Sequence, residues 1–290
     1  MQRIALWLLA LFICAAAVIA AEPQSNEFKL TISGQTEFES DGKKHKVGME
    51  TVVRYIRRRE GRSVQIVCQT LAVKHWSDGQ LTAEGTLDRE KMSFTGPDGK
   101  RQQQSAANEP ELKKTLEASF GTVLAKLELD EDGAEIKQTI TGDANAKDVL
   151  ENGVVTHCLL FHAAFPRDKN SWTRTLEYSA PGGGAATGEL KYEKIDNSSY
   201  EPAAKDQKTV KVSGALTAPV VRDTARRIMS RNVKMEIQGE QTFDTALQEW
   251  TSGSHTATVV YPMQDGDRGA TTAKCVMTIR LERVVEDKKK

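Results

Sequence analysis

The sequence predicts a mainly β protein, built from antiparallel meanders of long, curved strands that form a half-barrel, a barrel or a sandwich. Apolar and polar residues alternate along several stretches, which is typical of strands with one buried and one solvated face. Asp-Gly pairs recur between these stretches and favour tight hairpin turns, because both residues tolerate positive φ. The pairs lie in segments 40–43, 77–80, 97–100, 131–134 and 264–267.

Two stretches of the chain carry the same strand-like pattern. "FKLTISGQTEF" at residues 28–38 returns as "VKMEIQGEQTF" at residues 233–243. A strand pattern containing Cys68 follows the first stretch after 30 residues, and one containing Cys275 follows the second after 32. Matching strands at matching spacing predict two similar halves. Chance similarity between amphipathic strands is the alternative, because alternation alone constrains half of the shared positions.

We therefore expect a single β-rich domain over residues 22–290. Its halves would be residues 22–142 and 166–285, joined by a helical insert at 143–165. This insert is a short apolar segment that Pro166 ends.

Another short helical insert is predicted shortly after residue 107. Asn108 and Glu111 have the spacing of a capping box, with Asn in place of the usual Ser or Thr. Gly121 is expected to end the helix. The residues that would share one helical face are Leu112, Leu116 and Phe120.

The first residues have the order of a secretory signal peptide. Arg3 precedes an apolar run from Ile4 to Ala21 that ends in small residues. We predict cleavage after Ala20, so that residues 1–20 are the signal and the protein is exported, to the periplasm or outside the cell. An uncleaved anchor helix is the alternative, because the run just reaches the length that spans a bilayer.

Composition excludes one class of partner. The chain has 40 Lys and Arg against 40 Asp and Glu, and loss of the signal removes only Arg3. A nearly neutral domain lacks the basic surface of a nucleic-acid-binding protein. No second apolar run approaches spanning length, so we expect no membrane span after cleavage.

Cysteine usage argues against a disulfide scaffold. Cys14 leaves with the signal, and the bulky Ile13 before it disfavours a lipid anchor there. Three cysteines then remain, so at most one bridge forms within a chain. Cys68 and Cys275 lie on the apolar sides of their strands, and a bridge between them is one interpretation. The other is a pair of buried free thiols. The third thiol is Cys158.

The segment "THCLLFH" contains the residues best suited to chemistry. On a helix Cys158 and His162 would lie one turn apart, as a metal site or as a thiol with its base, with His157 nearby. No further ligand lies near in the sequence, and the apolar surroundings favour a packed core segment. We therefore predict no catalytic residue, no metal site and no cofactor.

Other motifs have simpler structural interpretations. "DEDG" at 130–133 lacks the later ligands of a calcium loop and is explained by a hairpin turn. The arginines of "RYIRRREGR" at 54–62 are expected to form a solvated strand end. Trp76, Trp172 and Trp250 are expected in the core or at its rim, whereas an exposed Trp on a β face would suggest a sugar-stacking platform.

Several segments, taken in order, resemble those of a family of secreted bacterial β-rich proteins that is classed only as a domain of unknown function. They are "HWSDGQLTAEG", "ELKKTLEASFGTVLAKLELDEDGAEI", "FHAAFPRDKNSWTRTLEY" and "GEQTFDTALQEWTSGSHTATV". The resemblance covers most of the chain after the signal. One departure is Ser171 before Trp172, where members of that family usually have Gly. The family has no assigned catalytic residues, so the resemblance implies no site.

The predicted function follows from export, the β fold and the lack of a catalytic motif. We expect a non-enzymatic cell-envelope protein that binds an apolar or lipid-like ligand in a β concavity, by analogy with lipoprotein-carrier folds. The alternative is a structural or interaction protein of the envelope without a small ligand. A hydrolase or metal enzyme is the third interpretation.

Overall fold

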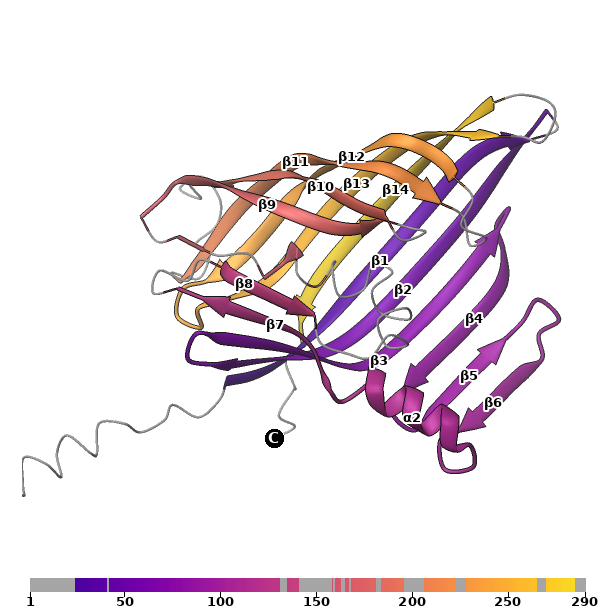
Figure 1. Ribbon diagram of the computed structural model, residues 1–290, viewed down its shortest axis with the longest axis horizontal. Coiled ribbons are helices and arrows are strands. Elements are labelled where there is room, and N and C mark those ends of the chain that lie inside the picture. The colour runs from indigo at the N-terminus through magenta and orange to yellow at the C-terminus, as the bar shows by residue number, and fades with distance from the viewer. Residues whose placement is uncertain are drawn as a thin grey trace, which may run out of the picture.

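The protein is described by a computed structural model over residues 24–40, 42–130, 135–140, 158, 160–162, 165–166, 168–180, 184–195, 206–222, 228–264 and 270–284. These residues form one antiparallel sheet of 14 strands and one helix with defined bounds (Figure 1). The predicted mainly β fold is therefore confirmed. The sheet is not closed, because β8 and β9 each have a single strand partner within the described residues.

The strands are long and follow one another closely. They are β1 (Gln24–Ser40), β2 (Lys43–Glu60), β3 (Ser63–Ser77), β4 (Gln80–Asp88), β5 (Lys91–Thr95), β6 (Arg101–Ser105), β7 (Val123–Leu129), β8 (Glu135–Ile140), β9 (Ser171–Ala180), β10 (Gly184–Lys194), β11 (Gln207–Arg222), β12 (Ile228–Asp244), β13 (Glu249–Gln264) and β14 (Ala270–Arg283). Their order is β6-β5-β4-β3-β2-β1-β14-β13-β12-β11-β10-β9. Two meanders thus meet where the first strand pairs with the last.

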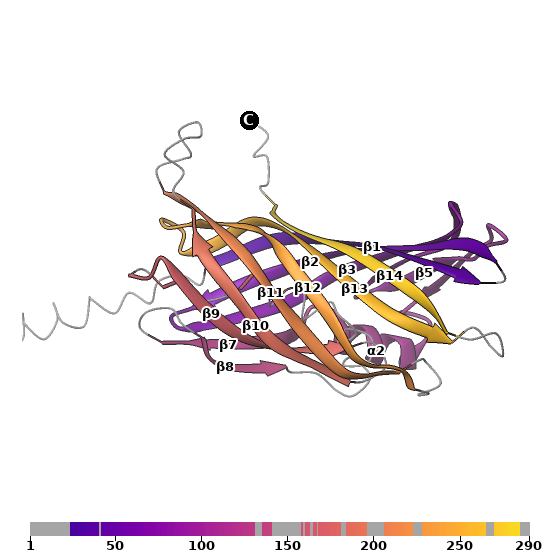
Figure 2. The ribbon, with the colours of Figure 1, turned by 90° about the horizontal axis from the view of Figure 1, so that it is seen from above.

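The sheet divides at β3. The first part of β3, from Ser63 to Val67, pairs with β7, and the later part, from Thr70 to Ser77, pairs with β4. One branch continues through β4, β5 and β6, and the other returns through β7 and β8. In Figure 2 β1 and β14 lie on one side of the molecule and β7 and β8 on the opposite side, so the sheet curls around an interior.

Alternation along the strands decides which side chains enter that interior. Phe28, Leu30 and Ile32 of β1 are buried, whereas Ser33 between Ile32 and Gly34 is exposed. Residues directly opposite in an antiparallel pair lie on the same face. The register of β1 therefore places on the concave face, opposite Phe28, Leu30 and Ile32, the side chains of Tyr55, Val53, Thr51, Leu281 and Ile279.

The helix α2 (Pro110–Ser119) lies beside the ends of β4, β5 and β6 (Figure 1). Its predicted apolar face is confirmed, because Leu116 and Phe120 are buried in the core. The predicted capping box is wrong: Glu109 is the N-cap and makes no side-chain capping bond. Pro110 explains the start, because its fixed φ suits the first helical position and it has no N–H to satisfy.

Positive φ marks the ends of several elements, as expected. Gly121 (φ +78°) follows the helix and donates its N–H to Cys68 O at 2.8 Å, which ties the helix end to β3. The hairpin turns predicted at 40–43, 77–80 and 97–100 are confirmed by Gly42, Gly79 and Gly99, with φ of 70°, 83° and 71°. The turns predicted at 131–134 and 264–267 extend outside the described residues.

Other predictions fall wholly or partly outside the described residues. The signal peptide at 1–20 does, as does most of the helical insert at 143–165, of which Cys158 and Leu160 are helical. The two repeated stretches form parts of β1 and β12. The division into two similar halves stays a prediction. Among the described helices, none has the length and apolar character needed to cross a membrane.

Candidate functional site on the concave face

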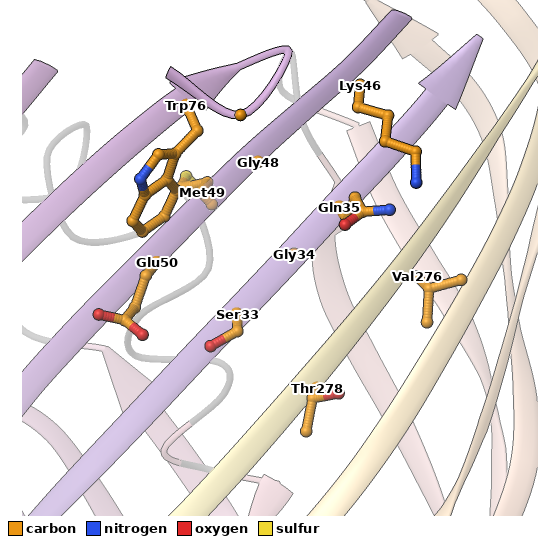
Figure 3. Close-up of a pocket in the computed structure, with 11 residues that line it drawn as sticks. Ser33, Gly34, Gln35, Lys46, Gly48, Met49, Glu50, Trp76, Val276 and Thr278 are labelled. Atoms are coloured by element: carbon orange, nitrogen blue, oxygen red, sulfur yellow. The ribbon is translucent and has the colours of Figure 1, made fainter. Parts of the chain in front are cut away.

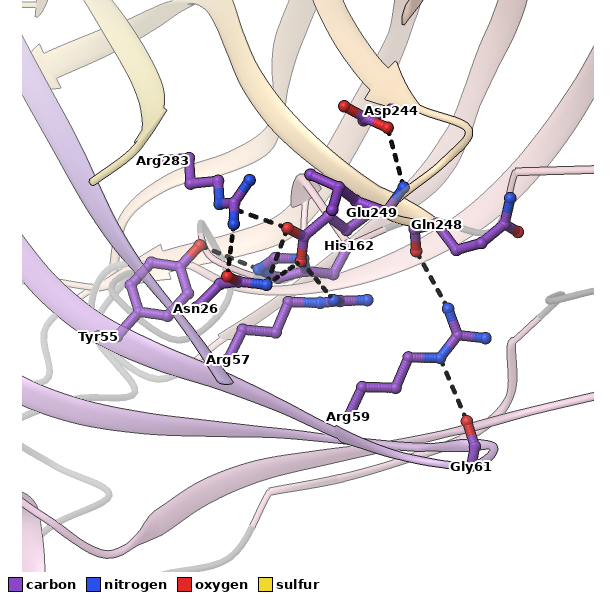
Figure 4. A network of polar contacts seen from close by, with 11 residues as sticks. Asn26, Tyr55, Arg57, Arg59, Gly61, His162, Asp244, Gln248, Glu249 and Arg283 are labelled. Carbon is purple, nitrogen blue, oxygen red and sulfur yellow. Dashed lines mark hydrogen bonds and ion pairs between the residues drawn. The ribbon is translucent and has the colours of Figure 1, made fainter. Parts of the chain in front are cut away.

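One end of the concave face is built around a buried carboxylate. Glu249, at the start of β13, is fully buried, and its Oε2 accepts a hydrogen bond of 3.0 Å from Arg57 Nη1 (Figure 4). Asn26 Nδ2 donates to both carboxylate oxygens, at 2.9 and 3.0 Å. Arg283 Nε lies 3.5 Å from Oε1, and Arg283 Nη2 donates to Asn26 Oδ1 at 2.7 Å. This ionic cluster joins β1, β2, β13 and β14.

The cluster corrects the prediction of a solvated arginine strand end. Arg57 is buried because the alternation of β2 turns it toward the same side as Tyr55. Arg58, which follows the buried Arg57, is exposed, as expected. Burial lowers the pKa of Arg57, and the Glu249 carboxylate opposes that change. A buried guanidinium needs such a partner, because an unpaired charge in the interior is very costly.

Next to the cluster, an inner segment consisting of Cys158, Leu160–His162 and Phe165 packs against this end of the concave face. His162 Nε2 and Tyr55 Oη share a hydrogen bond of 2.9 Å (Figure 4). Phe161 stacks on His255 of β13 with ring centroids 4.6 Å apart. The segment is thereby held from both β2 and β13, although it lies far from each in the sequence.

Two further contacts hold the inner segment. Gln241 Nε2 donates to Leu160 O at 3.2 Å, and it lies 2.9 Å from His255 Nε2. Phe165 stacks on Phe243 with centroids 4.1 Å apart. The predicted apolar segment ending at Pro166 is thus confirmed as a packed element wherever the structure describes it.

The environment of the thiol and imidazole groups bears on the metal and catalytic interpretations. Burial raises the pKa of Cys158, so its thiol stays protonated and is a poor nucleophile. Burial lowers the pKa of His162 and brings that of His255 to about 4, so both imidazoles are neutral near pH 7. No group of three or more His, Cys, Asp and Glu suited to a metal occurs among the described residues, and His157 lies outside them.

The disulfide interpretation needs correction. Cys68 and Cys275 are both free thiols. Cys68 lies opposite Tyr55, which lies opposite Phe28, whereas Cys275 lies opposite Thr36. These two positions are eight steps apart along β1, roughly 27 Å at 3.4 Å per residue. Sharing an apolar face did not bring the thiols together, because they lie toward opposite ends of it.

The end of the concave face away from the ionic cluster has a different character. Val47 and Met49 of β2 and Phe94 of β5 point to the concave side, since Val47 and Met49 lie opposite Thr36 and Gly34, and Phe94 lies opposite Gly85. Their exposed fractions are 41%, 38% and 46%. They continue a partly buried apolar surface that borders the core: Val73, Leu87, Val259 and Met277. We call Val47, Met49 and Phe94 the apolar rim.

Sequence reasoning missed both the ionic cluster and the rim. Arg57 and Glu249 are 192 positions apart. Glu249 precedes Trp250, which is also buried, so alternation gives no signal that a carboxylate turns inward. The rim residues look like any core strand residues, and only the curl of the sheet leaves them uncovered.

No protein-family model matches the sequence, and no curated protein matches it. Among solved structures, lipovitellin, described for its lipid–protein interactions, is similar over 91% of this chain with 7% identity and a TM-score of 0.48. This chain spans 25% of that chain. The translocator domain of the autotransporter NalP from Neisseria meningitidis is similar over 97% of this chain and 96% of its own, with 8% identity and a TM-score of 0.33.

OccAB2 of Acinetobacter baumannii is similar over 90% of this chain and 98% of its own, with 6% identity and a TM-score of 0.21. At these values the structural similarities carry no functional argument. The resemblance to a family of secreted bacterial β-rich proteins stays a prediction.

Proposed function

We propose that this chain is an exported, non-enzymatic cell-envelope protein that binds an apolar, lipid-like ligand on the concave face of its sheet. The observation that carries the proposal is the apolar rim. Its three side chains keep more than a third of their surface exposed although they lie on the face that elsewhere forms the core. An apolar surface left uncovered inside a curved sheet favours a ligand that would cover it.

The two ends of the concave face support this proposal in different ways. The ionic cluster and the inner segment fill one end with charged and aromatic contacts, which hold β1, β2, β13 and β14 together. The rim offers Met49, whose flexible side chain adapts to ligands of different shape. Each methylene of a ligand that leaves water there contributes about 0.8 kcal/mol of binding free energy.

A non-enzymatic role is supported by the state of the groups that chemistry would use. The Cys158 thiol is held protonated, and His162 faces Tyr55 in a buried site. Catalysis needs a nucleophile, a base and an orienting group around an open position for the substrate.

Native mass spectrometry of the protein purified from its export compartment, followed by solvent extraction, tests the proposal. We expect a reproducible extra mass that extracts as a lipid or another apolar molecule. A clean mass of the protein alone, combined with no binding of a fluorescent fatty acid, would overturn it. In that case cross-linking in the envelope would test the alternative of a structural or interaction protein.

A matched pair of variants tests whether the ligand binds on the concave face. Val47→Glu places a carboxylate on the rim, whereas Val260→Glu places the same group on the outer face, where Val260 is 52% exposed. Both sites are exposed, so neither variant should unfold the protein. We expect Val47→Glu to weaken fatty-acid binding by about tenfold or more, because the charge would be desolvated by an apolar ligand. Equal affinities of the two variants would contradict a ligand at the rim.

A further inference from the structure

A groove of about 530 Å³ lies across β1, β2, β3 and β14. Its side chains alternate with those of the core. Ser33 and Gln35 flank Gly34, whose place on the concave face follows from that of Ile32, so they point to the outer face. The groove therefore lies on the opposite side of the sheet from the apolar rim (Figure 3). The side chains on the outer face that line it are those of Ser33, Gln35, Lys46, Glu50, Trp76, Val276 and Thr278. Met49 of the rim also borders the groove, although its side chain belongs to the concave face.

Trp76 and Gly48 form the aromatic part of the groove. They lie directly opposite each other on β3 and β2. A Cβ added to Gly48 would lie 3.5 Å from the indole, so the absent side chain leaves the ring lying over bare backbone. Figure 3 shows the indole across β2, between Gly48 and Glu50. Trp76 is only partly buried, which leaves ring surface at the groove.

A row of polar side chains runs beside the indole. Ser33 lies opposite both Glu50 and Thr278, so the three side chains form one line across β2, β1 and β14. Glu50 is partly buried, and within the described residues no hydrogen bond or ion pair engages its carboxylate. The side chains of Ser33 and Thr278 likewise have no partner in the described part of the chain. Lys46, which also lines the groove, does have a partner, because its Nζ lies 2.8 Å from Glu37 Oε1.

We propose that this groove binds an uncharged oligosaccharide. The apolar C–H face of a hexose matches the indole face of Trp76, and its hydroxyl groups match the unpaired oxygens beside it. A carboxylate such as that of Glu50 accepts strong hydrogen bonds from hydroxyl donors, and the Ser33 and Thr278 hydroxyls both donate and accept. An anionic ligand would be repelled by Glu50, and a lipid chain would leave the polar row without partners.

This inference does not depend on the proposed apolar ligand, because the two sites lie on opposite faces of the sheet. If the proposed apolar ligand is disproved, the proposed oligosaccharide site still stands, and the reverse also holds. Val47→Glu, which tests the rim, changes no side chain of the groove.

The test is an NMR titration of the full protein labelled at tryptophan with ¹⁵N. Trp76 is the tryptophan that lines the groove, whereas Trp172 and Trp250 pack against Phe165 in the core. Cellohexaose and chitohexaose, at millimolar concentration, are the probes. We expect a saturable shift of the Trp76 indole N–H signal with at least one of them and no shift for the core tryptophans. If neither sugar shifts the Trp76 signal, the proposal is wrong.

Three variants separate a sugar site from a general surface effect. Glu50→Gln keeps the shape of the side chain but removes the charge, so we expect affinity to fall about tenfold. Gly48→Val should fold, since its Cβ makes only an ordinary contact, but should fill the groove and abolish the shift. Leu81→Ala is the control, because Leu81 lies opposite Trp76 on the same face and is exposed but does not line the groove.

The sugar affinities of these variants decide whether the groove is a sugar site. Retained binding in Leu81→Ala together with loss in Gly48→Val supports an oligosaccharide groove. If Gly48→Val and Glu50→Gln bind the sugars as the unaltered protein does, the proposal is overturned. If this face instead binds a protein through Leu81, and neither sugar shifts the Trp76 signal, the proposal is also wrong.

Discussion

The Arg57 guanidinium and the Glu249 carboxylate form an ion pair of 3.0 Å in the interior, with the carboxylate fully buried. Because Asn26 and Arg283 also contact Glu249, this single carboxylate connects strands from both ends of the chain. The pair lies at one end of the concave face, and the partly exposed apolar rim lies at the other.

Removal of the Glu249 charge should be strongly destabilising. Glu249→Gln leaves the buried Arg57 without its counter-ion, and breaking such a pair typically costs about 3–5 kcal/mol of unfolding free energy. Urea unfolding followed by circular dichroism measures this. Glu37→Gln is the matched control, because its pairing with Lys46 is solvent-exposed, and we expect no measurable change there. Equal stability of both variants would contradict a structural role for the cluster.

Stability should fall as the pH is lowered from about 6.5 to 4. The pKa of His255 is lowered from its model-peptide value of 6.5 to about 4 by burial, so the unfolded chain takes up the proton first. The stabilisation is complete above pH 6.5 and is lost as the pH falls toward 4, by about 3 kcal/mol for this group. The lowered pKa of His162 acts in the same direction.

Unfolding free energies measured across this pH range check that prediction. His255→Gln should show a shallower decline, whereas His75→Gln, at an exposed position, should follow the unaltered protein. Identical slopes for all three proteins would show that His255 does not titrate as described.

A methyl group at Gly253 should disturb the inner segment. A Cβ there would lie 2.6 Å from the Phe161 ring, closer than atoms approach, so Gly253→Ala should cost about 1–3 kcal/mol of unfolding free energy. Gly34→Ala is the control on the same face, because its Cβ meets only Met277 at 4.0 Å. We expect it to be neutral or slightly stabilising, since it restricts the unfolded chain. Comparable losses in both variants would argue against the Phe161 contact.

The thiols should react at different rates. Cys275 is partly exposed, whereas Cys68 and Cys158 are buried, and burial raises the pKa of Cys68 to about 12. In the folded protein we expect a thiol reagent to label Cys275 first and the other two only on unfolding. Mass spectrometry of digested peptides identifies the labelled residue. Protection of both Cys68 and Cys275 that a reductant removes would instead reveal a bridge between them.

Individual residues show which local features of the fold could be predicted from the sequence. Phe28, Leu30 and Ile32 alternate with polar residues in the first repeated stretch, and they are buried, because alternation is a local property of a strand. Gly121 was expected to end a helix, and it does so with positive φ. The capping box failed because Pro110 sets the start of the helix more strongly than Asn108 does.

Long strands, tight Asp-Gly turns and the helix near residue 110 were determined by the sequence itself, because backbone propensity and the period of two act between near neighbours. Tertiary structure alone decided which faces meet. Pairing of β1 with β14 and the division at β3 curl the sheet, and that curl buries Glu249 beside Arg57 yet leaves Met49 uncovered. Burial and pairing depend on residues far apart in the chain, and no local pattern records which of them come into contact.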